Sequence, residues 1–129
     1  MTPKPFNPGF RIDAIDTAVL ILGAAGSAWA ASVSGWLGLI IAFVVGHFFL
    51  FCNVFRLARP LELAWSAVFL TLIGSTLMNE TPGWIISFSV SLIVTCVVIG
   101  LQLRKPSYHG WAWQRINPAL PQWWAAQGN

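Results

Sequence analysis

Six polar residues cluster near the end of one apolar stretch and in the turn after it: His47, Cys52, Asn53, Arg56, Arg59 and Glu62. An imidazole can donate or accept a hydrogen bond, relay a proton or ligate a metal. Guanidinium groups can grip a phosphate or a carboxylate through two parallel hydrogen bonds. The sequence therefore predicts ligand-binding residues at His47, Asn53, Arg56 and Arg59.

His47 lies about halfway along its apolar stretch, where an ionisable side chain suggests a function. A neutral ring could simply hydrogen-bond a carbonyl or hydroxyl of a neighbouring helix. It could also contact a lipid, quinone or pigment, or handle a proton. Haem ligation would need a second ligand from a partner chain, because His109, the other histidine, lies in a polar tail. The cofactor stays unknown at this stage.

Helical rotation separates His47 from the small residues of its stretch. At about 100° per residue, one broad face carries Gly38, Ala42, Gly46, Asn53 and Arg56. His47 points away from that face. If the small residues pack against a neighbouring helix, we expect His47 to face lipid, a second chain or a bound ligand.

The charged residues at this boundary allow two interpretations. Asp16 begins the first apolar stretch at the same depth, so it or Glu62 could pair with Arg56. We expect a structural ion network of Asp16, Arg56, Arg59 and Glu62. The alternative is an anion site in which Arg56, Arg59 and Asn53 bind a phosphate or carboxylate, with a lipid headgroup as the nearest such anion.

Catalytic and metal-binding patterns find no support, and we predict neither catalytic residues nor a metal site. The chain has no glycine-rich phosphate loop, no HExxH and no serine nucleophile elbow. Cys52 follows His47 by five residues, which separates their side chains by about 140° around a helix. They cannot form a Cys–His pair on one helix, and an enzyme, although not excluded, is not what the sequence favours.

The elements that position these residues are apolar helices. The 129 residues are 57% hydrophobic and 9% charged, against roughly a quarter charged in soluble domains. Four apolar segments, at about 13–32, 36–57, 61–78 and 83–103, approach the ~20 residues that a membrane-spanning helix needs. We predict an all-α integral membrane protein with four transmembrane helices in an up-down-up-down antiparallel bundle.

The basic residues orient this bundle. Lys and Arg precede the first segment, separate the second from the third and follow the fourth, whereas 32–35 and 79–83 contain none. Cytoplasmic segments collect Lys and Arg, so we expect both termini in the cytoplasm and a location in the inner (plasma) membrane. The first segment also resembles a secretory signal peptide, but Asp13 and Asp16 fit that pattern poorly.

Two interfacial segments flank the transmembrane domain, which we place at 12–105. Residues 1–11 contain three prolines and form an N-terminal arm. Residues 106–129 hold half of the eight tryptophans, so this tail is expected to lie on the membrane surface or to dock on a partner. The net charge of +3 comes from residues that flank spans, which argues against nucleic-acid binding.

The functional prediction is a non-catalytic subunit of a membrane assembly that contacts lipids and copies of itself or partner chains. It could hold a lipid, quinone or pigment near His47. One alternative is a small homo-oligomeric channel or transporter whose pore is lined by Ser87, Ser91 and Thr95. A second is a membrane enzyme or redox subunit that uses His47, Asn53, Arg56 and Glu62.

Overall fold

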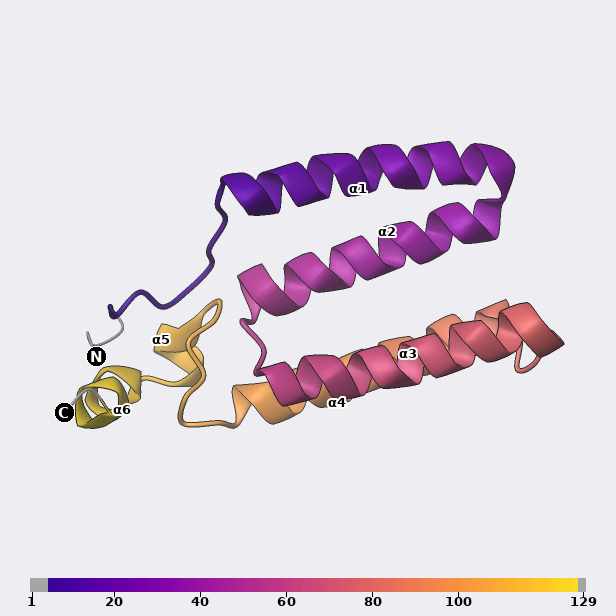
Figure 1. Ribbon diagram of the computed structural model, residues 1–129. Helices are drawn as coiled ribbons and strands as arrows, with labels where there is room; N and C mark the ends of the chain where they lie inside the picture. Colours follow the sequence, from indigo (N-terminus) through magenta and orange to yellow (C-terminus); the bar gives the residue numbers. More distant parts are fainter. Residues whose placement is uncertain (1–4, 128–129) are drawn as a thin grey trace.

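The computed structural model describes residues 5–127 and is all-helical over that range. Figure 1 shows the long helices side by side and the short helices α5 and α6 beyond one end. The elements are α1 (Ala14–Val33), α2 (Gly35–Phe49), the π-helical turn η1 (Leu50–Val54), α3 (Arg59–Asn79), α4 (Trp84–Leu103), α5 (Trp113–Ile116) and α6 (Leu120–Gln127).

The predicted membrane-spanning helices are present. Four segments are long and apolar enough to cross a bilayer: Ala14–Val33, Gly35–Val54, Arg59–Asn79 and Trp84–Leu103. The first begins at a capping box, in which the Asp13 carboxylate accepts from the Asp16 amide and the Asp16 carboxylate accepts from the Asp13 amide. The chain is therefore a multi-pass membrane protein by helix length and composition.

The second span ends earlier than the predicted residue 57. It changes from α-helix to π-helix at Leu50, where the Phe55 amide bonds to the Leu50 carbonyl over five residues, and it ends at Val54. Arg56 then takes a left-handed backbone conformation with φ of 50°. Arg56 and Arg59 consequently lie in a connection and in the next helix, and not on one helical surface.

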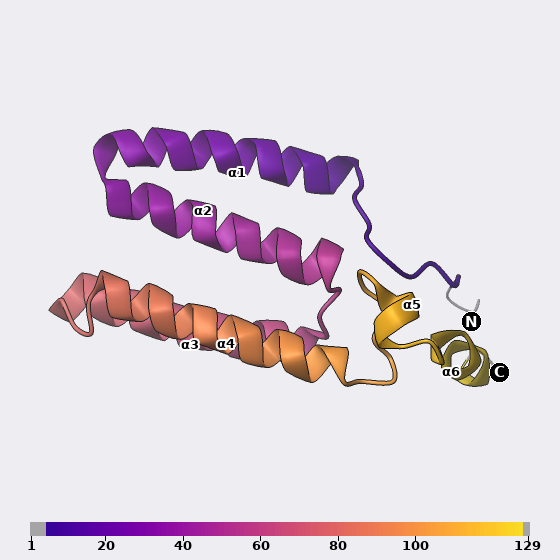
Figure 2. The ribbon, with the colours of Figure 1, turned by 180° about the vertical axis from the view of Figure 1, so that it is seen from behind.

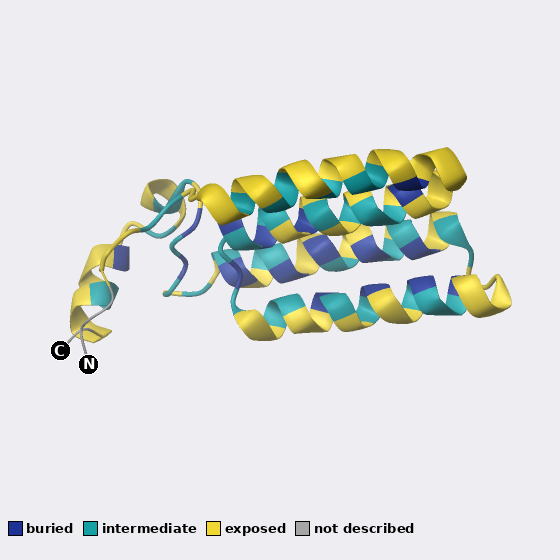
Figure 3. Cartoon of the chain, turned by 45° about the horizontal axis from the view of Figure 1, so that its top comes forward, coloured by how far each residue is buried: buried dark blue, intermediate teal, exposed yellow. Residues whose placement is uncertain are grey.

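The four helices form two pairs. α1 packs on α2, and α3 packs on α4. In both Figure 1 and Figure 2, α2 lies between α1 and the pair formed by α3 and α4. Buried residues lie where the helices face one another, and exposed residues cover the outer faces (Figure 3). Thus α2 has neighbours on two sides.

The contacts within and between the pairs differ in kind. Within the first pair a Cβ placed on Gly38 would come within 2.5 Å of the Ala31 Cβ, so α1 and α2 approach backbone to backbone. Between the pairs, aromatic rings fill a wider gap. Phe43 of α2 stacks 5.4 Å from Phe69 of α3, and Trp36 stacks 5.3 Å from Trp84.

The N-terminal segment and the tail lie together beyond one end of the helices (Figure 1). The Gly9 amide donates to the His109 carbonyl over 2.6 Å, and the Phe6 ring lies 5.8 Å from that of Trp113. Tyr108 is fully buried, and its hydroxyl donates to the Trp111 carbonyl over 2.6 Å. The tail therefore contacts its own chain and contains two short helices.

Candidate functional site

His47 is buried among α2, α3 and α4. The residue is 8% exposed, its Nε2 lies 2.9 Å from the Thr95 hydroxyl of α4, and its Nδ1 lies 2.8 Å from the Phe43 carbonyl. The ring stacks on Trp65 of α3 with centroids 4.6 Å apart, and Phe43 lies 4.2 Å away. Both ring nitrogens thus have partners within the chain.

The Thr95 hydroxyl is a shared partner of three helices. A carbonyl can only accept, so Nδ1 of His47 carries the hydrogen that is donated to Phe43. Nε2 of His47 and the Ser91 carbonyl lie 2.9 and 2.8 Å from the Thr95 hydroxyl oxygen, and the same oxygen accepts the Trp65 Nε1 hydrogen over 2.8 Å. Three helices meet at one hydroxyl oxygen, with each of these polar atoms paired.

The predicted rotation of His47 agrees with the structure, and so does the hydrogen bond expected to a hydroxyl of a neighbouring helix. The lipid, second chain or ligand expected on this side of α2 is not what His47 faces. Gly38 faces Ala31 of α1, and His47 points the other way. Because α2 is the central helix, that direction leads to α3 and α4 of the same chain and not to lipid or a second chain. A ligand beside His47 would have to replace the Thr95 contact or displace Trp65.

Asn53 lies in the π-helical turn, 1% exposed, and ties it to the N-terminal segment. Its Nδ2 donates to the Arg11 carbonyl over 2.5 Å and to the Asp16 carboxylate over 2.7 Å. Its Oδ1 is the one buried side-chain oxygen or nitrogen without a hydrogen-bond partner in residues 5–127. The Asn53 side chain therefore holds the start of α1 in place.

Glu62 is the carboxylate that pairs with an arginine. It lies 3.7 Å from the Arg59 Nε, and it accepts a 3.1 Å hydrogen bond from the Cys52 thiol. The Arg59 side chain is 81% exposed, so this pair adds little stability. Of the network expected at Asp16, Arg56, Arg59 and Glu62, the structure brings Arg59 and Glu62 together and directs Asp16 to Asn53 instead.

Arg56 has no carboxylate partner among the described residues. Its guanidinium donates to the Asn7 carbonyl over 2.6 Å. Burial, followed by the charge of Arg11, lowers the pKa of Arg56. Hydrogen bonds from Asn53 to the Arg11 carbonyl and from Arg56 to the Asn7 carbonyl thus hold the N-terminal segment against the end of the second span.

The hydroxyl stripe of α4 belongs to the core. Ser87 and Ser91 are fully buried, and Thr95 is 6% exposed. Ser87 lies 2.9 Å from the Thr76 hydroxyl of α3, and Ser91 donates to the Ser87 carbonyl over 2.7 Å. A pore between copies of the chain would therefore need other lining residues.

Three side chains that interact with the predicted site residues were not predicted in these roles: Thr95 as the partner of His47, Trp65 as its stacking neighbour and Arg11 as a charge that acts on Arg56. The signal available for Trp65 was its indole N–H, which inside an apolar helix must find an acceptor on another helix.

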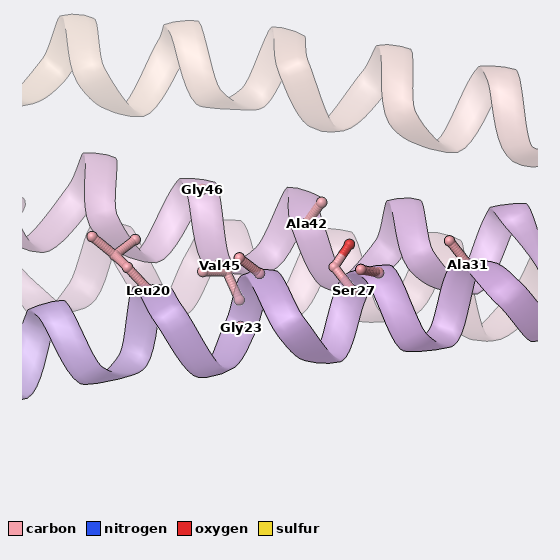
Figure 4. A pocket seen from close by; sticks show the side chains of 9 residues that line it. Leu20, Gly23, Ser27, Ala31, Ala42, Val45 and Gly46 are labelled. Carbon is pink, nitrogen blue, oxygen red and sulfur yellow. The ribbon is translucent and has the colours of Figure 1, made fainter.

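An open groove of about 460 Å³ runs between α1 and α2. Figure 4 shows Val45 of α2 lying against Gly23 of α1 in this groove. The lining residues are mostly small: Leu20, Gly23, Ala24, Ser27, Ala28, Ala31, Ala42, Val45 and Gly46. The Ser27 hydroxyl donates to the Gly38 carbonyl over 2.7 Å, so the groove offers an apolar surface.

No protein-family model matches the chain, and no curated protein or solved structure matches it significantly. Within residues 5–127, no three His, Cys, Asp or Glu side chains are grouped closely enough to hold a metal ion. A functional assignment must therefore come from the geometry of the helices.

Proposed function

We propose that this protein is a non-catalytic subunit of an assembly in the inner membrane, and that it associates with copies of itself or with partner helices through the groove between α1 and α2. The four spans run up-down-up-down, with both termini in the cytoplasm. The observation that carries the proposal is the exposure of α1. Ala30 is the only buried residue of this 20-residue helix.

The distribution of charge supports the orientation. The segment before α1, the start of α3 with the connection that precedes it, and the segment after α4 lie at the end of the helices that also holds the tail (Figure 1). These parts of the chain contain Arg11, Arg56, Arg59 and the basic residues after α4. The connections at the other end, Ser34 and 80–83, carry no Lys or Arg. The positive-inside rule places the basic end in the cytoplasm.

Labelling of single cysteines tests this orientation in a background with Cys52→Ser and Cys96→Ala. We expect a membrane-impermeant maleimide to label Glu80→Cys from outside intact cells and Ser107→Cys only after the membrane is opened. The reverse pattern would overturn the orientation.

Gly46 supports association through the groove. A Cβ placed on Gly23 would meet Val45 at 2.7 Å, so Gly23 serves packing within the chain. A Cβ placed on Gly46 would meet nothing within 4 Å, and Gly46 is exposed. Glycine and alanine on an open helix surface allow a close approach of a further helix, where van der Waals contact between backbones drives association in lipid.

Native mass spectrometry of the protein extracted with its own lipids tests the assembly. We expect wild type to retain a second copy or a partner chain, and Gly46→Leu to lose it while staying folded. Gly100→Leu is the matched control, because a Cβ on Gly100 of α4 also meets nothing within 4 Å and Gly100 lies outside the groove. A wild-type protein that is monomeric, or equal losses in both variants, would refute the proposal.

A lipid, quinone or pigment near His47 stays a prediction from the sequence. The retained mass in the same spectra would identify such a ligand, and His47→Phe should then release it. Retention of the ligand by His47→Phe would place it elsewhere, with the groove as the other apolar surface available.

A further inference from the structure

The end of the second span brings two arginines from distant parts of the chain to one place. Three hydrogen bonds tie the N-terminal segment to η1 and the residue after it. The Arg11 amide donates to the Asn53 carbonyl over 3.2 Å, the Asn53 side chain donates to the Arg11 carbonyl, and Arg56 donates to the Asn7 carbonyl. The positions of Arg11 and Arg56 are therefore fixed relative to each other by the fold.

The nearby carboxylates form no ion pair with either arginine. Asp16 accepts from the Asn53 side chain and from the Asp13 amide, and Asp13 accepts from the Asp16 amide. The hydrogen bond from the Asp16 amide is the largest cause that lowers the pKa of Asp13, and the positive charge of Arg11 makes a smaller contribution in the same direction. No carboxylate lies within 4.0 Å of the Arg11 or Arg56 guanidinium in the part of the chain that the structure describes.

Like charges repel, and half-burial of Arg56 strengthens the repulsion by lowering the local dielectric constant. Arg56 donates one hydrogen bond to the Asn7 carbonyl, so other N–H groups of its guanidinium can donate to a further acceptor. An anion between the two groups would remove the repulsion and accept from both forks. Arg59 differs, because it has Glu62 as its partner.

We propose that Arg11 and Arg56 together form a binding site for a phosphate group at the end of the first two spans. The phosphate group can belong to an anionic lipid headgroup, which lies at this depth when the spans cross a bilayer, or to a soluble phosphate. The site does not depend on association of the chain with a partner. It pairs Arg56 with Arg11, whereas the sequence pattern suggested Arg56 with Arg59.

The test measures binding to the full chain in a neutral detergent by native mass spectrometry and isothermal titration. The probes are a short-chain phosphatidylglycerol, the uncharged diacylglycerol with the same chains, and inorganic phosphate. We expect phosphatidylglycerol to bind and diacylglycerol not to bind. Arg11→Gln and Arg56→Gln should each weaken binding about tenfold or more, because each removes a charged hydrogen-bond donor.

Two variants make the result specific. Arg59→Gln, a basic residue at the same end of the helices, should leave binding unchanged within about twofold, because its partner is Glu62. Arg11→Gln keeps the backbone hydrogen bonds of residue 11, so it tests the site without loss of the fold. Circular dichroism checks the helix content of each variant.

The outcomes separate the two sources of phosphate. Tight binding of phosphatidylglycerol with weak competition by inorganic phosphate identifies a lipid site, and equal binding of inorganic phosphate identifies a soluble ligand. The proposal would be overturned if neither phosphatidylglycerol nor inorganic phosphate binds. It would also fail if Arg59→Gln weakened binding as much as Arg11→Gln does, since general attraction to basic residues would then explain the affinity.

Discussion

His47 Nε2 lies 2.9 Å from the Thr95 hydroxyl, 48 residues further along the chain. This contact links the first helix pair, α1 with α2, to the second pair, α3 with α4. The same hydroxyl accepts from Trp65, and the ring of Trp65 stacks on His47. One oxygen atom thus fixes the register between α2, α3 and α4 inside a layer of aromatic side chains.

Removal of this hydroxyl should destabilise the fold. Thr95→Val keeps the side-chain volume and leaves the Nε2 of His47 unpaired, while Trp65 retains its 3.2 Å contact with the Ser91 carbonyl. We expect a loss of about 1 to 2 kcal/mol in the free energy of unfolding, because single side-chain hydrogen bonds in membranes average ~0.6 kcal/mol and a buried unpaired group costs more. Unfolding in mixed micelles, followed by circular dichroism, measures it.

Thr71→Val is the matched control for this prediction. Thr71 lies exposed on α3, and its hydroxyl donates to the Ala67 carbonyl of its own helix. We expect a change within about 0.5 kcal/mol. Equal losses for the two threonine variants would mean that the contact between His47 and Thr95 contributes nothing to the packing of the helix pairs.

The sequence predicted the four apolar helices because composition and length suffice for that inference. Hydropathy defines a segment that needs ~20 residues to cross a bilayer, and the capping residue Asp13 marks the start of α1. The position of α2 between α1 and the pair formed by α3 and α4 could not be predicted from the sequence. Rotation around α2 correctly separated His47 from Gly38, but only the tertiary arrangement shows that α2 has a helix on each side.

The sequence predicted which polar residues lie at the end of the second span, but it did not predict which of them contact one another. The predicted span 36–57 included Arg56, but the π-helical turn and the left-handed conformation of Arg56 end the helix before that residue. The widened turn contacts both ends of the sequence, because Asn53 donates to Arg11 and Asp16 and the Val54 carbonyl accepts from the Trp111 amide. Local periodicity carries no information on such contacts.

The close approach of α1 and α2 at Gly38 gives a second prediction. In Gly38→Ala the new Cβ would lie 2.5 Å from the Ala31 Cβ and 2.8 Å from the Ser27 carbonyl oxygen. Because the two helix backbones would have to separate, we expect a loss of about 1 to 3 kcal/mol in unfolding free energy. Gly46→Ala, which meets no atom within 4 Å, should change it by less than about 0.5 kcal/mol. Similar losses for both would indicate a general effect of glycine replacement on the helix.

The capping box at the start of α1 should respond to pH. The hydrogen bond from the Asp16 amide is the largest cause that lowers the pKa of Asp13 below 3.8. A carboxyl group with a lowered pKa in the folded state stabilises that state above its unfolded pKa, and the effect is lost as pH falls through the folded value. The first turn of α1 should therefore be fully capped above pH 3.8 and should fray below it.

Amide hydrogen exchange of Asp16 and Thr17 measures this fraying, after correction for the intrinsic pH dependence of exchange. Asp13→Asn is the control, because its amide oxygen can cap the helix and does not titrate in this range. In this variant we expect the protection of the Asp16 and Thr17 amides to stay constant over the pH range in which Asp13 titrates in wild type. A pH response equal to that of wild type would assign the titration to another group.

The contact between the tail and the second span can be tested through the one tyrosine of the chain. In Gly110→Ala the new Cβ would lie 2.6 Å from the Phe55 carbonyl oxygen and 2.8 Å from that of Val54, which accepts from the Trp111 amide. These are backbone atoms that cannot rotate away, so residues 106–116 should detach from η1. Faster amide exchange of Trp111 would report the detachment directly.

Tyr108 supplies an independent readout of the same change. Burial raises its pKa from 10.0 to about 12. An acid whose pKa is raised by folding stabilises the docked tail below its unfolded pKa, and this contribution disappears between pH 10.0 and about 12. Because the chain contains a single tyrosine, ultraviolet absorbance of tyrosinate reports Tyr108 alone. We expect the midpoint to fall toward 10.0 in Gly110→Ala and to stay near 12 in Gly74→Ala, whose Cβ meets no atom within 4 Å. An unchanged midpoint in Gly110→Ala would show that the close approach at Gly110 does not hold the tail in place.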